Sequence, residues 1–425
     1  MSVVRGLHVL VVVGTLITLG SASPVAADAG AAQVACPAPP ANVSTPYDGP
    51  HLTYRTSAGH VEVITAPPSN VYDQVFGYED ATVSSGTSTR AIGTPSAWVS
   101  QNDVPEEHLA YRSQDGHVHE LWRHTGCGPW VHTDLTKAAG AKARAVGNVA
   151  GFGDSLRFVM YRGKDGHLHA LTWSSTTKKW RDTDVTKLTH ATSDDVSEPY
   201  IRNGAVIYRT ANGHVHLLQR GSHGWVDTDV WAKAKSKVHA LGNPTVYYSS
   251  NPAPSVEALH VLFRGTDRHV HELWGPFATG KWYDNDLTKL TGTPANATTD
   301  PVGYPQWFGD FDPGLTVSYI GKNGISCGFR KETGLDDPTF SPSAPTPWSG
   351  SCGTAPSGIR VLASTPVQDG HIETAWAQSS GHVVLHYEDL TYVDVFEYDV
   401  TDTANAPLAA TGVSLYYTPT CYACY

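Results

Sequence analysis

The stretch HLAYRSQDGHVHELW, from His108 to Trp122, recurs along this chain of 425 residues and decides its fold. Close copies end at Trp173, Gln219 and Trp274, a weaker copy starts at His51, and degraded copies start at Leu315 and Glu373. The same turn position falls at Gly59, Gly116, Gly166, Gly213, Arg268, Gly324 and Gly381. A repeat of such regular spacing is typical of an array of small supersecondary units.

Each copy predicts a tight β-hairpin. Gln114, Asp115 and Gly116 suit a three-residue loop that is closed by a glycine in the left-handed region. This loop pairs Ser113 with His117 and sets the register of both strands. The other pairs that follow are Arg112 with Val118, Ala110 with Glu120 and His108 with Trp122.

A second motif follows the four best copies. It reads WVHTDLT from Trp130, WRDTDVT from Trp180, WVDTDV from Trp225 and WYDNDLT from Trp282. We therefore expect each unit to contain the hairpin, a short loop, a third strand led by Trp, and a longer linking segment with Pro and Gly. Low charge and plentiful Gly and Tyr favour strands and turns over helices.

The two faces of the second hairpin both carry large apolar groups. Leu109, Tyr111, His119 and Leu121 share one face, and His108, Ala110, Arg112, Val118, Glu120 and Trp122 share the other. A sheet covered on both faces is the condition inside a β-propeller. We predict an all-β propeller of about seven blades, or alternatively six with a divergent cap. A β-solenoid is the other architecture that the period admits.

The predicted propeller is one domain, residues 51–425, with divergent C-terminal blades. One terminus should complete the blade that the other begins, with a strand from residues 43–48 or 392–417. Residues 1–27 have the positive start, apolar stretch and small-residue end of a signal peptide, and residues 28–50 form an N-terminal segment. The sequence thus predicts a secreted, extracellular protein without stable membrane insertion.

The net charge of −11 argues against nucleic acid as a partner, because a phosphate backbone requires clustered Lys and Arg. Six cysteines in an exported chain suggest disulfides, and Cys327 with Cys352 is the pair that the sequence favours. The pairing of the remaining cysteines stays open: Cys36, Cys127, Cys421 and Cys424.

With YRSQDGHVHELW from Tyr111 and WVHTDLT from Trp130, the chain resembles the fungal fucose-specific lectin superfamily and related bacterial repeat proteins. The similarity covers residues 51–300 well and the rest by period only. It implies a propeller with sugar sites between blades, where an Arg and, twelve residues later, a Glu or Gln hold the hydroxyls. Glu120 and Glu272 fit the acid position, but His108 and His260 stand where the family has Arg.

A neutral sugar needs a bidentate donor, a carboxylate acceptor and an aromatic platform. We predict two such sets, and their residues are His108, Arg112, Glu120 and Trp122, and His260, Arg264, Glu272 and Trp274. Ala170 and Leu217 occupy the acid position in the third and fourth units. The junctions of these units are therefore predicted not to bind sugar. The alternative is structural, because the Arg recurs even where the acid is missing, as at Arg55, Arg162 and Arg209.

The His-x-His pairs, such as His117 with His119, place two imidazoles on one strand face and raise the question of a metal. No Cys or further His stands at a matching spacing, so we predict no metal site and no cofactor. We expect the second His to pack on its Tyr or Phe partner and the first to cap the turn. The recurrent aspartates of the second motif, such as Asp134, should accept backbone amide hydrogen bonds rather than bind calcium.

The resemblance, together with the two sets of Arg, Glu and Trp, implies a carbohydrate-binding protein whose partner is a glycan or polysaccharide. One alternative is a glycoside hydrolase or lyase, although no nucleophile, zinc or phosphate-loop motif occurs. Its catalytic carboxylates would come from the divergent part, from Asp310, Asp312, Asp336, Asp337, Glu388 and Asp389. The second alternative is an extracellular protein-interaction scaffold.

Overall fold

The computed structural model describes most of the chain after residue 49, and all described residues lie in one compact unit, Cys36–Tyr425. The described ranges are 50–65, 76–100, 105–124, 127–153, 157–191, 196–221, 224–249, 258–276, 280–294, 296–308, 312–322, 325–332, 348–353, 359–364, 371–389 and 394–417. The predicted signal peptide and residues 43–48 lie outside them.

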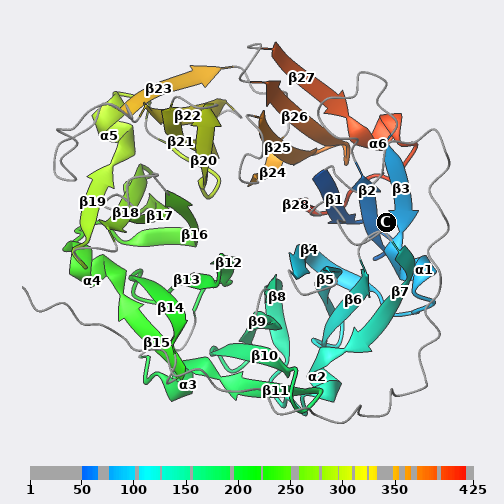
Figure 1. Ribbon diagram of the computed structural model, residues 1–425. Helices are drawn as coiled ribbons and strands as arrows, with labels where there is room; N and C mark the ends of the chain where they lie inside the picture. Colours follow the sequence, from blue (N-terminus) through cyan, green and yellow to red (C-terminus); the bar gives the residue numbers. More distant parts are fainter. Residues whose placement is uncertain are drawn as a thin grey trace, which may run out of the picture. The chain divides into compact units, whose positions relative to one another are not determined.

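The strands of this unit form seven four-stranded antiparallel sheets that stand around a centre, which confirms the predicted propeller and the count of seven blades (Figure 1). Blade 1 is β28-β1-β2-β3, and blades 2 to 7 are β4–β7, β8–β11, β12–β15, β16–β19, β20–β23 and β24–β27.

The strands nearest the centre are β28 (Ser414–Tyr417), β4 (Ala91–Ser100), β8 (Ala145–Gly153), β12 (Tyr200–Arg202), β16 (Ala240–Ser249), β20 (Val302–Phe308) and β24 (Ile359–Ser364). The next are β1 (Pro50–Arg55), β5 (Glu106–Ser113), β9 (Arg157–Gly163), β13 (Ala205–Arg209), β17 (Ala258–Gly265), β21 (Asp312–Ile320) and β25 (His371–Gln378).

The third strands are β2 (Val61–Thr65), β6 (Val118–His124), β10 (Leu168–Ser174), β14 (Val215–Gly221), β18 (Val270–Pro276), β22 (Ser326–Glu332) and β26 (Val383–Asp389). The outermost are β3 (Gly77–Asp80), β7 (Cys127–Asp134), β11 (Lys179–Asp184), β15 (Gly224–Asp229), β19 (Tyr283–Asp286), β23 (Trp348–Gly353) and β27 (Asp394–Asp399). Short helices follow six of them: α1 (Ala81–Ser84), α2 (Leu135–Ala138), α3 (Val185–Leu188), α4 (Val230–Ala234), α5 (Leu287–Thr291) and α6 (Val400–Thr403).

The hairpin register predicted for the second unit is confirmed. Arg112 pairs with Val118, and His108 with Trp122. Gly116 has φ 79°, and its amide donates to the carbonyl of Ser113 at 3.0 Å. In the fifth unit Arg268 takes this position with φ 64°, a conformation that side chains rarely adopt.

The linking segment, for which the sequence predicted only its length and its Pro and Gly, folds into a short helix and the innermost strand of the next blade. The second motif explains the helix. Asp134 caps α2 by accepting from the amide of Lys137 at 2.9 Å, as predicted for these aspartates. Leu135 is fully buried, and Thr136 Oγ1 accepts from the amide of Val118 at 2.8 Å. The motif therefore ties the outer strand to the hairpin.

The ring is closed by the C-terminal stretch. β28 pairs with β1, with Pro50 opposite Tyr417 and Thr53 opposite Ser414, so the last strand completes the first blade. This closure confirms the prediction for residues 392–417. Tyr416 is buried, and its hydroxyl donates to Glu107 of blade 2 at 3.2 Å.

Apolar side chains fill the spaces between neighbouring blades, so the two predicted hairpin faces are both covered. Leu109 and Tyr111 belong to a cluster with Val61 and Val63 of blade 1. Ala110 and Val118 belong to another, with Val159 and Tyr161 of blade 3, and Trp98 also joins this cluster. The second face of blade 2, with its predicted site residues, therefore lies against blade 3.

A disulfide joins Cys327 of β22 to Cys352 of β23, which are direct partners in the sheet of blade 6. This pair was predicted. The side chains of Cys36, Cys127, Cys421 and Cys424 lie outside the described part of the chain.

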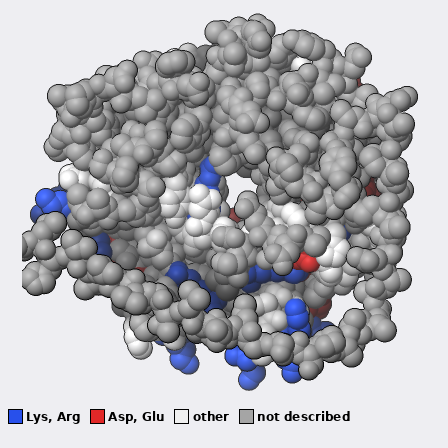
Figure 2. Space-filling model, in the orientation of Figure 1, with Lys and Arg blue, Asp and Glu red and all other residues white. Residues whose placement is uncertain are grey.

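In a space-filling view the ring is hollowed at its centre, and Lys and Arg side chains gather along the lower edge (Figure 2). That edge carries α2 and α3 in Figure 1, each with a lysine in its last turn, Lys137 and Lys187. Among the described residues, no helix has the length and apolar character needed to cross a membrane.

Candidate functional site: the junctions between blades

Glu120 lies at the junction of blades 2 and 3, on the predicted face with His108 and Trp122. Its carboxylate is fully buried, and His108 Nδ1 lies 3.1 Å from its Oε1 atom. Burial alone would raise the pKa of Glu120, but Arg157 and His108 outweigh it and lower this pKa. The His108 ring in turn stacks on Trp98, with 5.1 Å between ring centroids.

The basic partner of Glu120 is Arg157, at the start of β9 in blade 3. Arg157 Nε donates to Glu120 Oε1 at 3.2 Å, and Nη2 donates to Oε2. Its Nη1 donates to Glu106 Oε2 at 3.4 Å. The guanidinium also lies over two indoles, 5.8 Å from the ring centroid of Trp122 and 5.2 Å from that of Trp180.

These contacts assemble an Arg, two carboxylates and two indoles at one junction. Arg157 retains 13% of its side-chain exposure and Glu106 18%, whereas Glu120 retains none. Trp122 is half-buried. The outer part of the cluster, Trp122, Arg157 and Glu106, is therefore the part that solvent reaches.

The recurrent arginines of blades 1 to 5 connect each of these blades to the next blade or to the segment that leads into it. Arg112 Nε donates to the carbonyl of Gly147 in β8 at 2.7 Å. The same bond runs from Arg55 to Gly93 at 3.2 Å and from Arg209 to Gly242 at 2.9 Å. The remaining two have partners in the segments that lead into the next blade: Arg162 donates to the Val196 carbonyl at 3.2 Å, and Arg264 Nη2 lies 3.6 Å from Asp300.

This role explains why the arginine recurs where the acid is missing, because Arg55, Arg162 and Arg209 contact the following blade or the segment leading to it without any acid at the acid position of their own unit. It supports the structural alternative for these arginines. The contacts with sugar that the sequence predicted for Arg112 and Arg264 remain predictions.

Glu272, on the face of blade 5 that meets blade 6, is also buried and fully engaged. His260 Nδ1 lies 2.7 Å from its Oε1, and the Tyr247 hydroxyl donates to the same atom at 3.0 Å. Asn285 Nδ2 donates to Oε2 at 2.8 Å. Trp274 is half-buried and stacks on Tyr283, with centroids 4.7 Å apart.

The structure thus unites His108, Glu120 and Trp122 at one junction and His260, Glu272 and Trp274 at another. Sequence reasoning missed Arg157 and Glu106. The signal for Arg157 is an arginine that occurs in one unit only: the matching position of the second unit is Glu107. Because this arginine is absent from the other units, it does not serve a structural role that every blade shares.

The second histidine of each pair packs as expected on its aromatic partner. His119 stacks on Tyr111 at 5.4 Å, and the other good copies do likewise or lie tilted at similar distances. Burial, with a further contribution from His132, lowers the pKa of His119 to about 4. Asp284 and Asp267 instead outweigh burial at His271 and raise its pKa.

The expectation that the first histidine caps the turn is wrong. His117 Nδ1 lies 2.8 Å from Oδ2 of Asp134, the aspartate that caps α2, and the turn is held by Asp115, which accepts from the His117 amide at 3.1 Å. The prediction of no metal site considered only Cys and His as further ligands, and it stays a prediction. Among the described residues, the fold brings a carboxylate of the second motif close to the histidines in several blades.

Several predicted residues cannot be placed. Asp310, Asp336 and Asp337 lie outside the described residues, as do the side chains of Asp312, Glu388 and Asp389. Ala170 and Leu217, which stand at the junctions predicted to bind no sugar, are both buried. That prediction stays a prediction.

No protein-family model matches the chain, and no curated protein matches it. Among solved structures it is similar to SapL1 lectin in complex with alpha methyl fucoside, with 12% identity, coverage of 72% of this chain and 96% of the lectin, and a TM-score of 0.43. AofleA from Arthrobotrys oligospora is 11% identical over 77% of this chain and 91% of its own, with a TM-score of 0.44.

The Aleuria aurantia lectin, described as a six-bladed β-propeller, is 14% identical over 73% of this chain and 96% of its own, with a TM-score of 0.43. Similarities this distant assign neither a family nor a ligand. The seven blades of the present protein are established by its own sheets.

Proposed function

We propose that this protein is a secreted carbohydrate-binding propeller whose sugar sites lie at the junctions between blades. The observation that carries the proposal is the assembly of Arg157, Glu106 and Trp122 where blades 2 and 3 meet. An arginine, a carboxylate and an indole are the three groups that a neutral pyranose requires.

The role proposed for each side chain follows from how far it is exposed to solvent. Trp122 is the platform for the apolar face of the sugar, Arg157 donates to its hydroxyls, and Glu106 accepts from them. Glu120 and His108 lie beneath, where a buried ion pair fixes the guanidinium. Arg157 thereby takes the role that the sequence suggested for Arg112, whose Nε is already bonded to Gly147.

A second site of the same kind is proposed at the junction of blades 5 and 6. Trp274 is its platform, and Glu272, with His260, is its polar base. Arg264 is the proposed donor, and Asp300 holds its guanidinium at the edge of blade 6. Two separate junctions would give avidity for a polymeric glycan of a cell surface or wall.

Secretion is part of the proposal. The apolar N-terminal stretch with its small-residue end supports it, and a disulfide between Cys327 and Cys352 is usual in an oxidising compartment.

A glycan array with the chain from Asp28 onward tests the function, with methyl α-fucoside as the first competitor. The variant Trp122→Ala/Trp274→Ala removes both platforms. Trp225→Ala is the matched control, because Trp225 is also half-buried and packs on Phe158 at the junction of blades 3 and 4, where Ala170 replaces the acid.

We expect binding by the wild type and by the control variant, and its loss in the double variant. A folded wild type that binds no glycan would overturn the proposal. Release of reducing sugar from a bound glycan would instead support the hydrolase alternative.

A further inference from the structure

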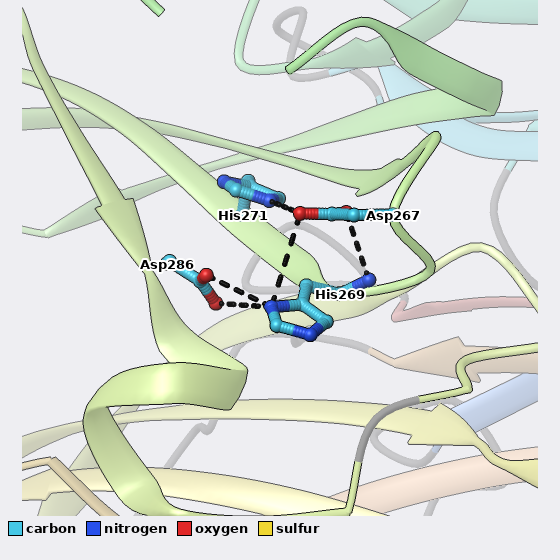
Figure 3. A group of neighbouring side chains, drawn as sticks. All are labelled: Asp267, His269, His271 and Asp286. Carbon is cyan, nitrogen blue, oxygen red and sulfur yellow. Dashed lines mark hydrogen bonds and ion pairs between the residues drawn. The ribbon is translucent and has the colours of Figure 1, made fainter. Parts of the chain in front are cut away.

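Blade 5 brings two imidazoles and two carboxylates together at the tip of its hairpin (Figure 3). Asp267 and His269 belong to the turn between β17 and β18, His271 lies near the start of β18, and Asp286 ends β19. Their four ligating atoms all lie within 4.8 Å of one another.

The spacing suits a single ion. His269 Nδ1 lies 2.8 Å from Asp286 Oδ2 and 3.8 Å from Asp267 Oδ2, and His271 Nε2 lies 3.2 Å from the same oxygen of Asp267. Four ligands that surround zinc tetrahedrally at its usual bond lengths lie about 3.3 Å from one another. These three separations bracket this value, and every other pair of ligating atoms lies within 4.8 Å.

The atoms that would not bind the ion are already held. Asp267 Oδ1 accepts from the His269 amide at 3.0 Å, and Asp286 Oδ1 accepts from the Lys289 amide at 2.9 Å. His271 Nδ1 lies 3.4 Å from Asp284 Oδ1, which leaves Nε2 facing the cluster. A carboxylate behind a ligating histidine is the usual arrangement that orients it.

We propose that Asp267, His269, His271 and Asp286 form a binding site for one divalent transition-metal ion, best suited to zinc. Two neutral imidazoles and two carboxylates balance a dication and combine nitrogen with oxygen ligands, which calcium and magnesium do not prefer. His271 is buried, while the other three retain 25 to 35% exposure, so an ion can enter from solvent.

The bound ion would fasten the hairpin turn to the outer strand and to α5. The fourth blade offers an internal comparison, because Asn212 stands where blade 5 has Asp267 and accepts from the His214 amide at 3.1 Å. The fold therefore accepts Asn at this position, so the first carboxylate can be removed there without disturbing the turn.

Two substitutions replace the two carboxylate ligands and are expected to keep the fold. Asp267→Asn copies blade 4, and Asp286→Asn retains a residue that caps helices well. The matched control is Asp399→Asn, which changes the same cap position at α6 in blade 7, outside any cluster of this kind among the described residues.

Equilibrium dialysis of tag-free protein against zinc chloride, read by elemental analysis, measures the bound ion. Cobalt(II) in place of zinc gives visible absorption bands that report a tetrahedral site. Thermal unfolding of each variant without metal verifies the fold.

We expect Asp267→Asn/Asp286→Asn to bind roughly one zinc fewer per chain than the wild type and to lose cobalt absorption, while Asp399→Asn binds the full amount. Any zinc that remains would belong to related groups, such as Asp165, His167 and Asp184 of blade 3. The proposal is overturned if wild type and double variant bind the same number of zinc ions, if neither binds any, or if calcium competes as well as zinc.

Discussion

The guanidinium of Arg157 in blade 3 donates to both carboxylate oxygens of Glu120 in blade 2. The pair crosses the junction, and Glu120 has no exposure to water. Removing one partner of a buried ion pair leaves the other charge buried without compensation, and this typically costs about 3–5 kcal/mol of stability.

We therefore expect Glu120→Gln and Arg157→Met each to lower the free energy of unfolding by a few kcal/mol. Together they should cost less than the sum, with a coupling of about 1–3 kcal/mol. Urea unfolding of the four proteins of this double-mutant cycle measures it. Additive effects would show that the two side chains do not interact in solution.

Arg112→Met separates the two roles considered for the recurrent arginine. The variant loses the bond to the Gly147 carbonyl, and we expect it to be destabilised by about 1–3 kcal/mol with unchanged glycan affinity. Arg209→Met, which breaks the same bond between blades 4 and 5, is the control for stability. A loss of affinity in a folded Arg112→Met protein would place this arginine in the sugar site instead.

Closure of the ring depends on Tyr416, which is buried between blades 1 and 2. Tyr416→Ala should cost about 3–5 kcal/mol, because it leaves a cavity at the closing strand. Tyr416→Phe keeps the ring and loses the bond to Glu107, for about 1 kcal/mol. Leu408→Ala, at an exposed position, should change little. Chemical denaturation ranks the three, and a mild effect of Tyr416→Ala would mean that β28 contributes little to closure.

His51 predicts a pH dependence of stability. Burial lowers its pKa from 6.5 to about 4; Glu107 has a smaller raising effect, and Arg123 lowers this pKa slightly further. The unfolded chain therefore binds more protons, so the contribution of His51 is fully present above pH 6.5 and is lost as pH falls toward 4.

His51→Asn should accordingly lose less stability than the wild type between pH 7 and pH 4.5, by about 2–3 kcal/mol. Urea midpoints at the two pH values measure the difference. His190→Asn, on an exposed turn where φ is 55°, serves as the control. Equal losses in wild type and His51→Asn would contradict the assignment. Glu62, whose pKa burial raises to about 7, acts in the opposite direction in both proteins and cancels in the comparison.

The hairpins were predictable because local chemistry specifies them. Gly116 sets the turn, the turn sets the register, and the register assigns His108, Glu120 and Trp122 to one face. The innermost strands were not predictable in the same way. Their sequences differ from blade to blade, and a shift of register between Ile92 and Ser96 breaks the alternation that marks a strand.

Only those residues of the candidate site that belong to the repeated motif were predictable from the sequence. Glu120 and Trp122 belong to the motif, but Arg157 comes from the next blade, and nothing local to either residue links them. The metal-binding cluster shows the same limit. Asp286 was expected to accept a backbone amide hydrogen bond, and its Oδ1 does so, but its Oδ2 faces the histidines only once the sheet has formed.

The stoichiometry of sugar binding tests the central claim most directly. Titration calorimetry with the best glycan should give two sites per chain for the wild type and for Trp225→Ala. Trp122→Ala and Trp274→Ala should each retain one. Two sites that persist in both single variants, or one site at every blade, would contradict sugar recognition at these two junctions.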